Sequence, residues 1–300
     1  QYISVTNLAY SSTGYSARPF VVTFPNNGIT DFGYETAFSA ASARGITLGD
    51  LDGDTRPDLV VTSDAGTRVG IYKNTSLTAG SLSFVLVNTI TAPLGVNTRG
   101  LALADFDGDG KLDLVVADYT NNLLRLYQNS TSGLSAITFT TGITLPTDSG
   151  PHEVKVADFD GDGRPDVVVG NVSSAPYTVS IFQNLLLFGS LSFSARQSIL
   201  GFSLPHNLAV GDLDNDGRPD IVVANTGANN IRLLQNVSTL GTITFTSALT
   251  LTSAALASPR GVALGDFDQD GNFDIVVNNQ SNSQAIFFLN KNNTIGSISF

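Results

Sequence analysis

Short apolar runs separated by turn-forming residues recur along most of the chain. One unit contains such runs at residues 100–104, 112–116, 123–127 and 136–140, each alternating in polarity or rich in β-branched side chains. Glycine, asparagine and proline lie between the runs, which is typical of strands joined by tight turns. No stretch shows a convincing helical period. The pattern therefore predicts units of four short β-strands and an all-β fold.

The four-strand unit repeats at a nearly constant interval. Its first acidic residue falls at positions 50, 105, 158, 212 and 266, which are 55, 53, 54 and 54 residues apart. The counterparts of the outer run 136–140 are residues 81–84, 190–193, 242–245 and 297–300. A fixed period of this size indicates a repeat architecture. Four antiparallel strands repeated around a ring form the blades of a β-propeller; a linear β-solenoid is the competing interpretation, although its units are usually shorter.

Each unit carries a nine-residue acidic loop between its first two strands. Residues 105–113 read DFDGDGKLD, with carboxylates at positions 1, 3, 5 and 9. Four carboxylates this close repel one another unless a cation lies between them. Alternating oxygen ligands and a glycine at position 6 are what Ca²⁺ coordination requires. Hydrated turns without metal are the alternative, but such turns do not need four carboxylates at fixed spacing in every repeat.

We therefore predict about five bound Ca²⁺, one for each loop. The twenty predicted ligands are Asp50, Asp52, Asp54, Asp58, Asp105, Asp107, Asp109, Asp113, Asp158, Asp160, Asp162, Asp166, Asp212, Asp214, Asp216, Asp220, Asp266, Asp268, Asp270 and Asp274. The first loop differs from the others because Thr55 stands at position 6, where a β-branched residue tolerates a left-handed conformation poorly.

Composition supports this interpretation. The loops hold 5 × 4 = 20 of the 26 acidic residues, and five Ca²⁺ would add +10 to a formal net charge of −11. The chain has no basic tract, which argues against nucleic acid as a partner. It has no cysteine, so disulfides, thiolate nucleophiles and cysteine–zinc sites are excluded. No apolar run approaches the length of a membrane span.

An extracellular location is expected. Free Ca²⁺ is abundant outside cells, where weak multi-aspartate sites fill best. The sequence begins at Gln1 rather than methionine, which suits a mature product after removal of a signal peptide.

The acidic loop followed by a valine-rich strand resembles the FG-GAP/VCBS repeat. The resemblance covers residues 28–300. It implies a propeller with Ca²⁺ in the turn between the first two strands of each blade, as in integrin α subunits, some fungal lectins and many secreted bacterial proteins. Because that family is functionally diverse, the resemblance implies no particular ligand.

The N-terminal residues depart from the repeat. Residues 3–5 resemble a first strand, 18–22 a second strand and 28–32 an outer strand, but Asn7 and Phe20 replace two of the aspartates. We predict that residues 1–43 form a degenerate, calcium-free blade and that residues 44–300 form five calcium-loop repeats. The whole chain, 1–300, is then a single six-bladed propeller of four-stranded blades. Five blades with an N-terminal extension are the alternative.

Two further sets of residues recur in the repeat. Six positions before each first aspartate lies a basic residue, and these are expected to ring the channel mouth opposite the calcium loops: Arg44, Arg99, His152, His206 and Arg260. They predict either a site for an acidic glycan or a partner carboxylate, or residues that cap the channel and bond neighbouring carbonyls. Possible N-glycosylation sequons begin at Asn74, Asn129, Asn171, Asn236, Asn279 and Asn292.

These features together predict a secreted, calcium-stabilised, non-enzymatic propeller that binds extracellular glycan or protein, with a role in adhesion. One alternative is a structural subunit that self-assembles into an extracellular filament by strand exchange. Another is a polysaccharide-acting enzyme, for which Glu153 beside His152 is the only candidate acid–base residue. No nucleophile is marked by the sequence, so no catalytic residue is assigned.

Overall fold

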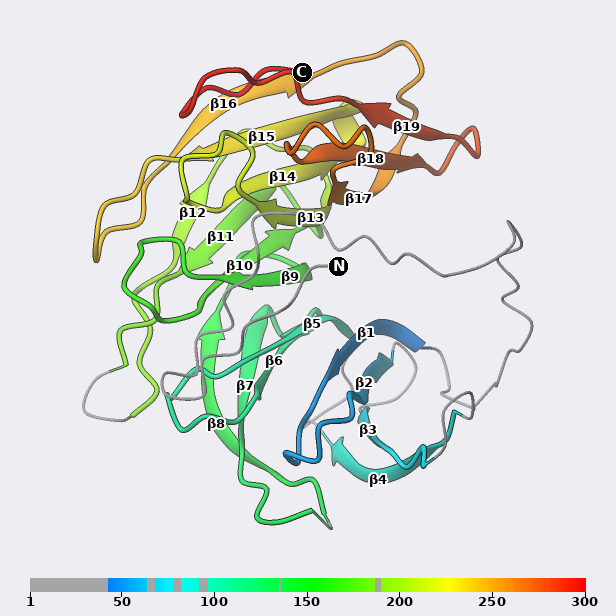
Figure 1. The fold of residues 1–300 in the computed structure, drawn as a ribbon, viewed down its shortest axis with the longest axis vertical. Coiled ribbons are helices and arrows are strands. Elements are labelled where there is room, and N and C mark those ends of the chain that lie inside the picture. The colour runs from blue at the N-terminus through cyan, green and yellow to red at the C-terminus, as the bar shows by residue number, and fades with distance from the viewer. Residues whose placement is uncertain (1–42, 64–67, 78–81, 92–96, 135, 187–189) are drawn as a thin grey trace.

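The computed structural model describes residues 43–63, 68–77, 82–91, 97–134, 136–186 and 190–300, which form five antiparallel sheets (Figure 1). The first sheet contains β1 (Ala43–Gly49), β2 (Asp58–Ser63), β3 (Arg68–Asn74) and β4 (Phe84–Thr91). The second contains β5 (Thr98–Ala104), β6 (Asp113–Asp118), β7 (Leu123–Asn129) and β8 (Phe139–Pro146). The third contains β9 (Pro151–Ala157), β10 (Asp166–Asn171), β11 (Thr178–Phe182) and β12 (Gln197–Ile199). The fourth contains β13 (Pro205–Gly211), β14 (Asp220–Asn225), the short 3₁₀ helix η1 (Thr226–Ala228), β15 (Asn230–Asn236) and β16 (Phe245–Leu251). The fifth contains β17 (Pro259–Gly265), β18 (Asp274–Asn279) and β19 (Ala285–Phe288).

The sheets are meanders that follow one another along an arc, as blades do in a propeller (Figure 1). The first strands β1, β5, β9, β13 and β17 lie in sequence along the inner side, each next to the following one. This arrangement confirms the predicted all-β, propeller-like fold. Among the described residues, no helix is long and apolar enough to cross a membrane.

The hydrophobic core lies between successive sheets. Val154 and Phe182 of the third sheet, for example, pack in one cluster with Val115 and Leu126 of the second. Three further clusters join the first sheet to the second, the third to the fourth and the fourth to the fifth. Strands covered on both faces must be apolar at consecutive positions, which explains runs such as 167–169, all 0 % exposed.

The outer strands begin later than the sequence pattern indicates. The expected strand 136–140 is β8, which starts at Phe139, where Phe139 pairs with Asn129. Phe84 and Phe245 start β4 and β16 in the same register. The alternating pattern before these phenylalanines arises because residues such as Ile137 are buried in the core from the connecting segment. In the third sheet the outer strand is β12, beyond the expected 190–193.

The last expected outer strand, 297–300, is not a strand. Its residues Ile298 and Phe300 pack on the core between the fourth and fifth sheets. Phe300 is the position at which the outer strand begins in other sheets, and the given sequence ends there. The fifth sheet has three strands among the described residues.

The two ends of the arc expose apolar faces that are covered elsewhere. Ile46 of the first sheet is 67 % exposed, whereas its repeat equivalents Leu101, Val154 and Leu208 are 7 %, 1 % and 0 % exposed. Phe287 of the fifth sheet is 54 % exposed, whereas Leu126 at the equivalent position is 1 % exposed. Within the part of the chain that the structure describes, each inner sheet is covered by its two neighbours, and the first and last sheets have one neighbouring sheet each.

The predicted degenerate blade lies outside the described residues except for Ala43, which opens β1. If that blade covers both end faces, the tryptophan in Ile46→Trp and in Phe287→Trp should be buried, so its emission should be blue-shifted and protected from quenching by acrylamide. The chain has no other tryptophan, so the emission comes from the introduced residue alone. Leu200→Trp, at a position 61 % exposed, is the matched control. Deleting residues 1–42 should shift both test emissions to that of the control. Emission equal to the control in the full chain would instead favour five blades with an extension.

Candidate metal centres

Each acidic loop is wound around the carboxylate at its first position. In the second loop, Asp105 Oδ1 accepts the backbone N–H groups of Gly108 at 2.8 Å and Asp109 at 3.1 Å, and Oδ2 accepts that of Gly110 at 2.9 Å. Gly110 has φ +86°, a left-handed conformation that glycine adopts without steric cost. The sequence thus folds the loop locally, because one carboxylate satisfies three consecutive amides of the turn.

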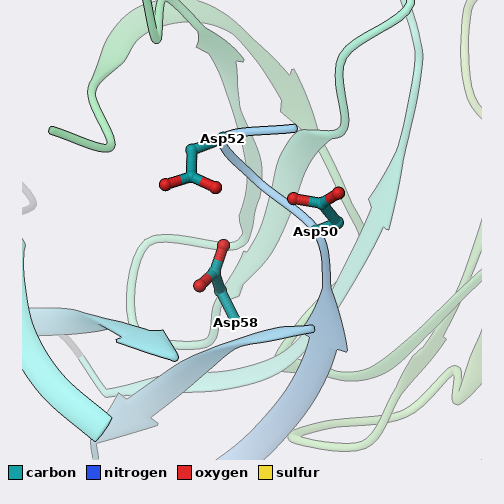
Figure 2. Close-up of side chains that lie close together, drawn as sticks. All are labelled: Asp50, Asp52 and Asp58. Atoms are coloured by element: carbon teal, nitrogen blue, oxygen red, sulfur yellow. The ribbon is translucent and has the colours of Figure 1, made fainter. Parts of the chain in front are cut away.

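The carboxylates at positions 1, 3 and 9 converge in every loop. In each group, one oxygen from each residue lies within 4.8 Å of the others, and Figure 2 shows the three side chains of the first group turned toward a common space. The groups are Asp50, Asp52 and Asp58; Asp105, Asp107 and Asp113; Asp158, Asp160 and Asp166; Asp212, Asp214 and Asp220; and Asp266, Asp268 and Asp274. Hard carboxylate oxygens at this spacing fit a divalent cation such as Ca²⁺.

The position-5 carboxylates lie outside these groups, and their role as ligands stays a prediction. Asp162 accepts the backbone N–H of Arg164 at 2.9 Å and forms an ion pair with its guanidinium. The reason is local, since a cation or donor two residues away captures the carboxylate. The residues concerned are Asp54, Asp109, Asp162, Asp216 and Asp270, paired with Arg56, Lys111, Arg164, Arg218 and Asn272.

The position-9 aspartates are the most buried members. Asp166 is 0 % exposed; its Oδ2 accepts the backbone N–H of Phe159 at 2.9 Å and its Oδ1 accepts that of Asn184 at 2.8 Å. Burial, together with the neighbouring Asp160 and Asp162, raises the pKa of Asp166 to about 7. Burial likewise raises the pKa of Asp113 and of Asp220 to about 7. Burial and the neighbouring carboxylates disfavour the ionised form of these aspartates. A bound cation would offset that charge and favour the ionised form.

The raised pKa values of these position-9 aspartates determine how the stability of the metal-free protein depends on pH. Because the pKa of these aspartates is higher in the folded than in the unfolded chain, the folded state binds more protons, and stability rises as pH falls through about 7. The two histidines act oppositely below about pH 6.5, because burial lowers their pKa to about 3 and about 4.

As the pH is lowered from about 8 to about 6.5 in chelator, we therefore expect the free energy of unfolding to increase by an amount on the order of 1–2 kcal/mol, or about 5 °C in Tm. In excess calcium the dependence should weaken or reverse, because protons and Ca²⁺ compete for the same oxygens. Thermal melts followed by circular dichroism measure both. A Tm that falls from pH 8 to 6.5 in chelator would contradict the expected protonation.

A buried asparagine links each of the second to fifth loops to the preceding sheet. Asn184 donates its Nδ2 to Phe106 O at 3.0 Å, and its backbone N–H to Asp166. The others are Asn129, Asn236 and Asn290, whose Nδ2 atoms reach Leu51 O, Phe159 O and Leu213 O at 2.9, 2.9 and 2.8 Å. An asparagine stands at or just after the end of the third strand in all five repeats, and in three of them it also begins a sequon. The sequon suggests glycosylation and so hides the structural role of the side chain. Asn184 and Asn290 stand at the same repeat position without a sequon. Their recurrence is the feature of the sequence that indicates the structural role.

The structure opposes the predicted glycosylation. All six sequon asparagines are buried, with exposed fractions of at most 7 %. The Nδ2 atom to which a glycan would be joined donates to a protein oxygen in the following five: Asn74, Asn129, Asn171, Asn236 and Asn279. A glycan at these atoms is incompatible with the folded contacts.

Four of the five basic residues of the inner strands lie close to one another. The rings of His152 and His206 lie edge to face with centroids 5.2 Å apart, and Arg99 and Arg260 are close enough to lower the pKa of both. His206 Nδ1 lies 3.0 Å from Thr226 Oγ1, and Arg260 donates to Gln280 Oε1 at 3.1 Å. Arg44 is exposed at the start of β1. Their ligand role stays a prediction.

Glu153, the candidate acid–base residue, forms an ion pair with Lys155 at 2.6 Å. Its carboxylate is therefore engaged on its own strand β9.

Sequence comparison identifies relatives of this repeat. Cartilage acidic protein 1 of Xenopus tropicalis is 27 % identical over 255 residues, covering 79 % of this chain and 38 % of the relative. The mouse protein of the same name is 23 % identical over 277 residues, covering 81 % and 41 %. The chain thus spans about two-fifths of the length of the relatives it matches.

Solved structures share the fold at low identity. An Agrocybe aegerita lectin, described as recognising non-reducing terminal N-acetylglucosamine, has a TM-score of 0.54 and 19 % identity, covering 85 % of this chain and 64 % of the lectin. A putative 6-phosphogluconolactonase from Bacteroides fragilis has a TM-score of 0.53 and 13 % identity, covering 73 % and 56 %. At this identity the likeness shows the fold alone.

The family model of the FG-GAP-like repeat matches at residues 50–116, 105–169, 172–223 and 212–277. These matches begin at or run across the acidic loops described above and extend over most of the chain. This chain therefore belongs to the FG-GAP-like repeat family.

Proposed function

We propose that this protein is a secreted, calcium-stabilised, non-enzymatic propeller that binds extracellular glycan or protein, in adhesion or matrix attachment. The observation that carries the proposal is the fivefold repetition of one acidic site at equivalent points of successive sheets. An ion held there by positions 1, 3 and 9 would offset the carboxylate charge and hold the first turn of each blade. Five equivalent sites favour a structural use of the metal over a single catalytic centre.

The comparisons support an extracellular setting. The relatives are named for cartilage, a tissue composed largely of extracellular matrix, and for their acidity. This chain is acidic as well, with a formal net charge of −11. The lectin that shares the fold binds a terminal sugar, which favours glycan as the first ligand class to test.

A cavity between two sheets offers a place for such a ligand. It has a volume of about 270 Å³ and lies between β4 and the pair β7 and β8. Its polar lining includes Asn88, Thr89, Arg125 and Thr144. Hydroxyl, amide and guanidinium groups beside apolar carbons are the lining that a sugar ring needs. We place the ligand here in preference to the channel mouth, where burial lowers the pKa of both histidines and so disfavours the charged form that would attract an anion.

A glycan panel in millimolar calcium tests the proposal. We expect binding of at least one glycan or matrix component, and Thr144→Tyr, which fills the cavity, should reduce that binding at least tenfold. Thr250→Tyr is the matched control, because Thr250 pairs with Arg232 on the fourth sheet as Thr144 pairs with Arg125 on the second. An inert panel with a monomeric protein would count against the binding function.

A filament subunit is the second candidate, favoured by the unpaired edge of β19. Among the described residues, β19 pairs only with β18, so its other edge presents backbone groups to a further strand. Electron microscopy in calcium distinguishes the two functions: ordered fibres favour assembly by strand exchange, and dispersed single particles favour binding.

A further inference from the structure

The position-3 carboxylate has a partner on the third strand of its own sheet in the first four loops. Gln128, Gln183 and Gln235 donate Nε2 to the position-3 carboxylates of the second, third and fourth loops, at 2.8, 2.6 and 2.7 Å. A neutral amide supplies one hydrogen bond and leaves the net charge of the group unchanged. In these loops the negative charge still requires a cation.

The first loop has a lysine at this position. Lys73 Nζ forms an ion pair with Asp52 Oδ2 and lies 3.5 Å from Asp54 Oδ2. It also donates to Leu134 O, in the segment between β7 and β8 of the second sheet. Three oxygen acceptors from two sheets therefore surround one ammonium group, as ligands surround an ion.

This ammonium lies on β3 beside the carboxylates of the first loop and is partly buried. The side chain of Lys73 is 12 % exposed, and those of Asp52 and Asp54 are 0 % and 5 % exposed. At this partly buried position a fixed positive charge repels a second cation held a few ångströms away. The first loop thus fits a divalent ion less well than the others.

The backbone of the first loop also differs from that of the other four loops. Thr55 has φ +70° at position 6, whereas glycine occupies that position in the other four loops with φ between +85° and +92°. A β-branched residue in this region is strained. The first loop therefore differs from the rest in both its charge and its turn.

We propose that the Lys73 ammonium is the resident cation of the first loop, which closes without Ca²⁺, while the other four loops take the metal. The inference rests on the proposed calcium binding of those loops. It makes Lys73 the residue that decides whether the loop is metal-dependent.

The test is the number of Ca²⁺ bound per full-length chain, measured by equilibrium dialysis and native mass spectrometry. Lys73→Gln installs the residue of three other repeats and should gain one ion. Gln128→Lys makes the reverse change in the second loop and should lose one. Lys155→Gln removes an equal charge from the Glu153 ion pair on β9, and should leave the number unchanged.

Hydrogen exchange gives a second readout in the wild-type chain. Chelation should speed exchange of the loop amides that the position-1 carboxylates hold in the second to fifth loops, and leave those of Gly53, Asp54 and Thr55 slow.

An unchanged ion number in Lys73→Gln, or equal acceleration in all five loops, would overturn the role of Lys73 while leaving calcium binding intact. If no variant binds Ca²⁺ at all, the proposed calcium dependence fails, and this inference fails with it.

Discussion

Removal of calcium is expected to cost this protein on the order of 10 kcal/mol of stability. A ligand that binds only the folded state stabilises it by about 2.7 kcal/mol when its free concentration is a hundred times its dissociation constant. Four such sites contribute about four times that value, because the acidic groups lie in separate loops. A loss of this size equals the whole stability of a typical domain. We therefore expect chelation to unfold the chain or leave it with disordered loops.

Calorimetry in millimolar calcium and in chelator measures this effect. Restoring calcium should restore the melting transition, whereas equal magnesium should restore little, because Mg²⁺ demands a rigid octahedral shell and retains its waters. Identical melting in calcium and in chelator would show that the aspartate groups are held by hydrogen bonds alone, and would remove the basis of the proposed function.

The local part of each site could be predicted from sequence. Asp105 and Gly110 lie within one loop, and the contacts that wind the turn span five residues at most. The repeat interval indicated successive sheets, and valine runs such as 167–169 indicated strands buried on both faces. All of these depend on near neighbours or on periodicity, which a single sequence displays directly.

Contacts between sheets could not be predicted in this way. Asn129 reaches Leu51 O, 78 residues earlier, and nothing near either residue indicates the bond. The local sequence around the same asparagine fits a sequon, which suggests a different role. The outer strands were placed too early for a related reason, since Ile137 is apolar to fill the core from a connecting segment.

The position-5 aspartates show a third limit. The spacing of the four carboxylates predicts four ligands for the metal. A cationic side chain at position 7, two residues after the position-5 aspartate, can also bind that carboxylate. Arg164 captures Asp162 with two contacts and also donates Nε to Asn184 O at 3.0 Å. Sequence spacing alone does not decide between these two partners.

Asp166→Ala is expected to be among the most damaging single substitutions in the protein. Asp166 is 0 % exposed, and its removal leaves the buried N–H groups of Phe159 and Asn184 without their acceptor. Each unsatisfied buried donor costs about 1–3 kcal/mol, so we expect a loss of about 4 kcal/mol even in chelator. In calcium the loss should be larger, because a ligand of the third loop is removed as well. Urea unfolding at fixed calcium and in chelator separates the two contributions.

Asp162→Ala in the same loop is the matched control. Asp162 lies outside the convergent group and pairs with a guanidinium that is 37 % exposed, so its loss should cost about 1 kcal/mol or less in chelator. In calcium the cost should stay that small if position 5 takes no part in binding the ion. A loss in calcium as large as that of Asp166→Ala would show instead that the carboxylate leaves Arg164 for the metal. The pair of substitutions therefore measures whether three or four aspartates hold the ion in the third loop.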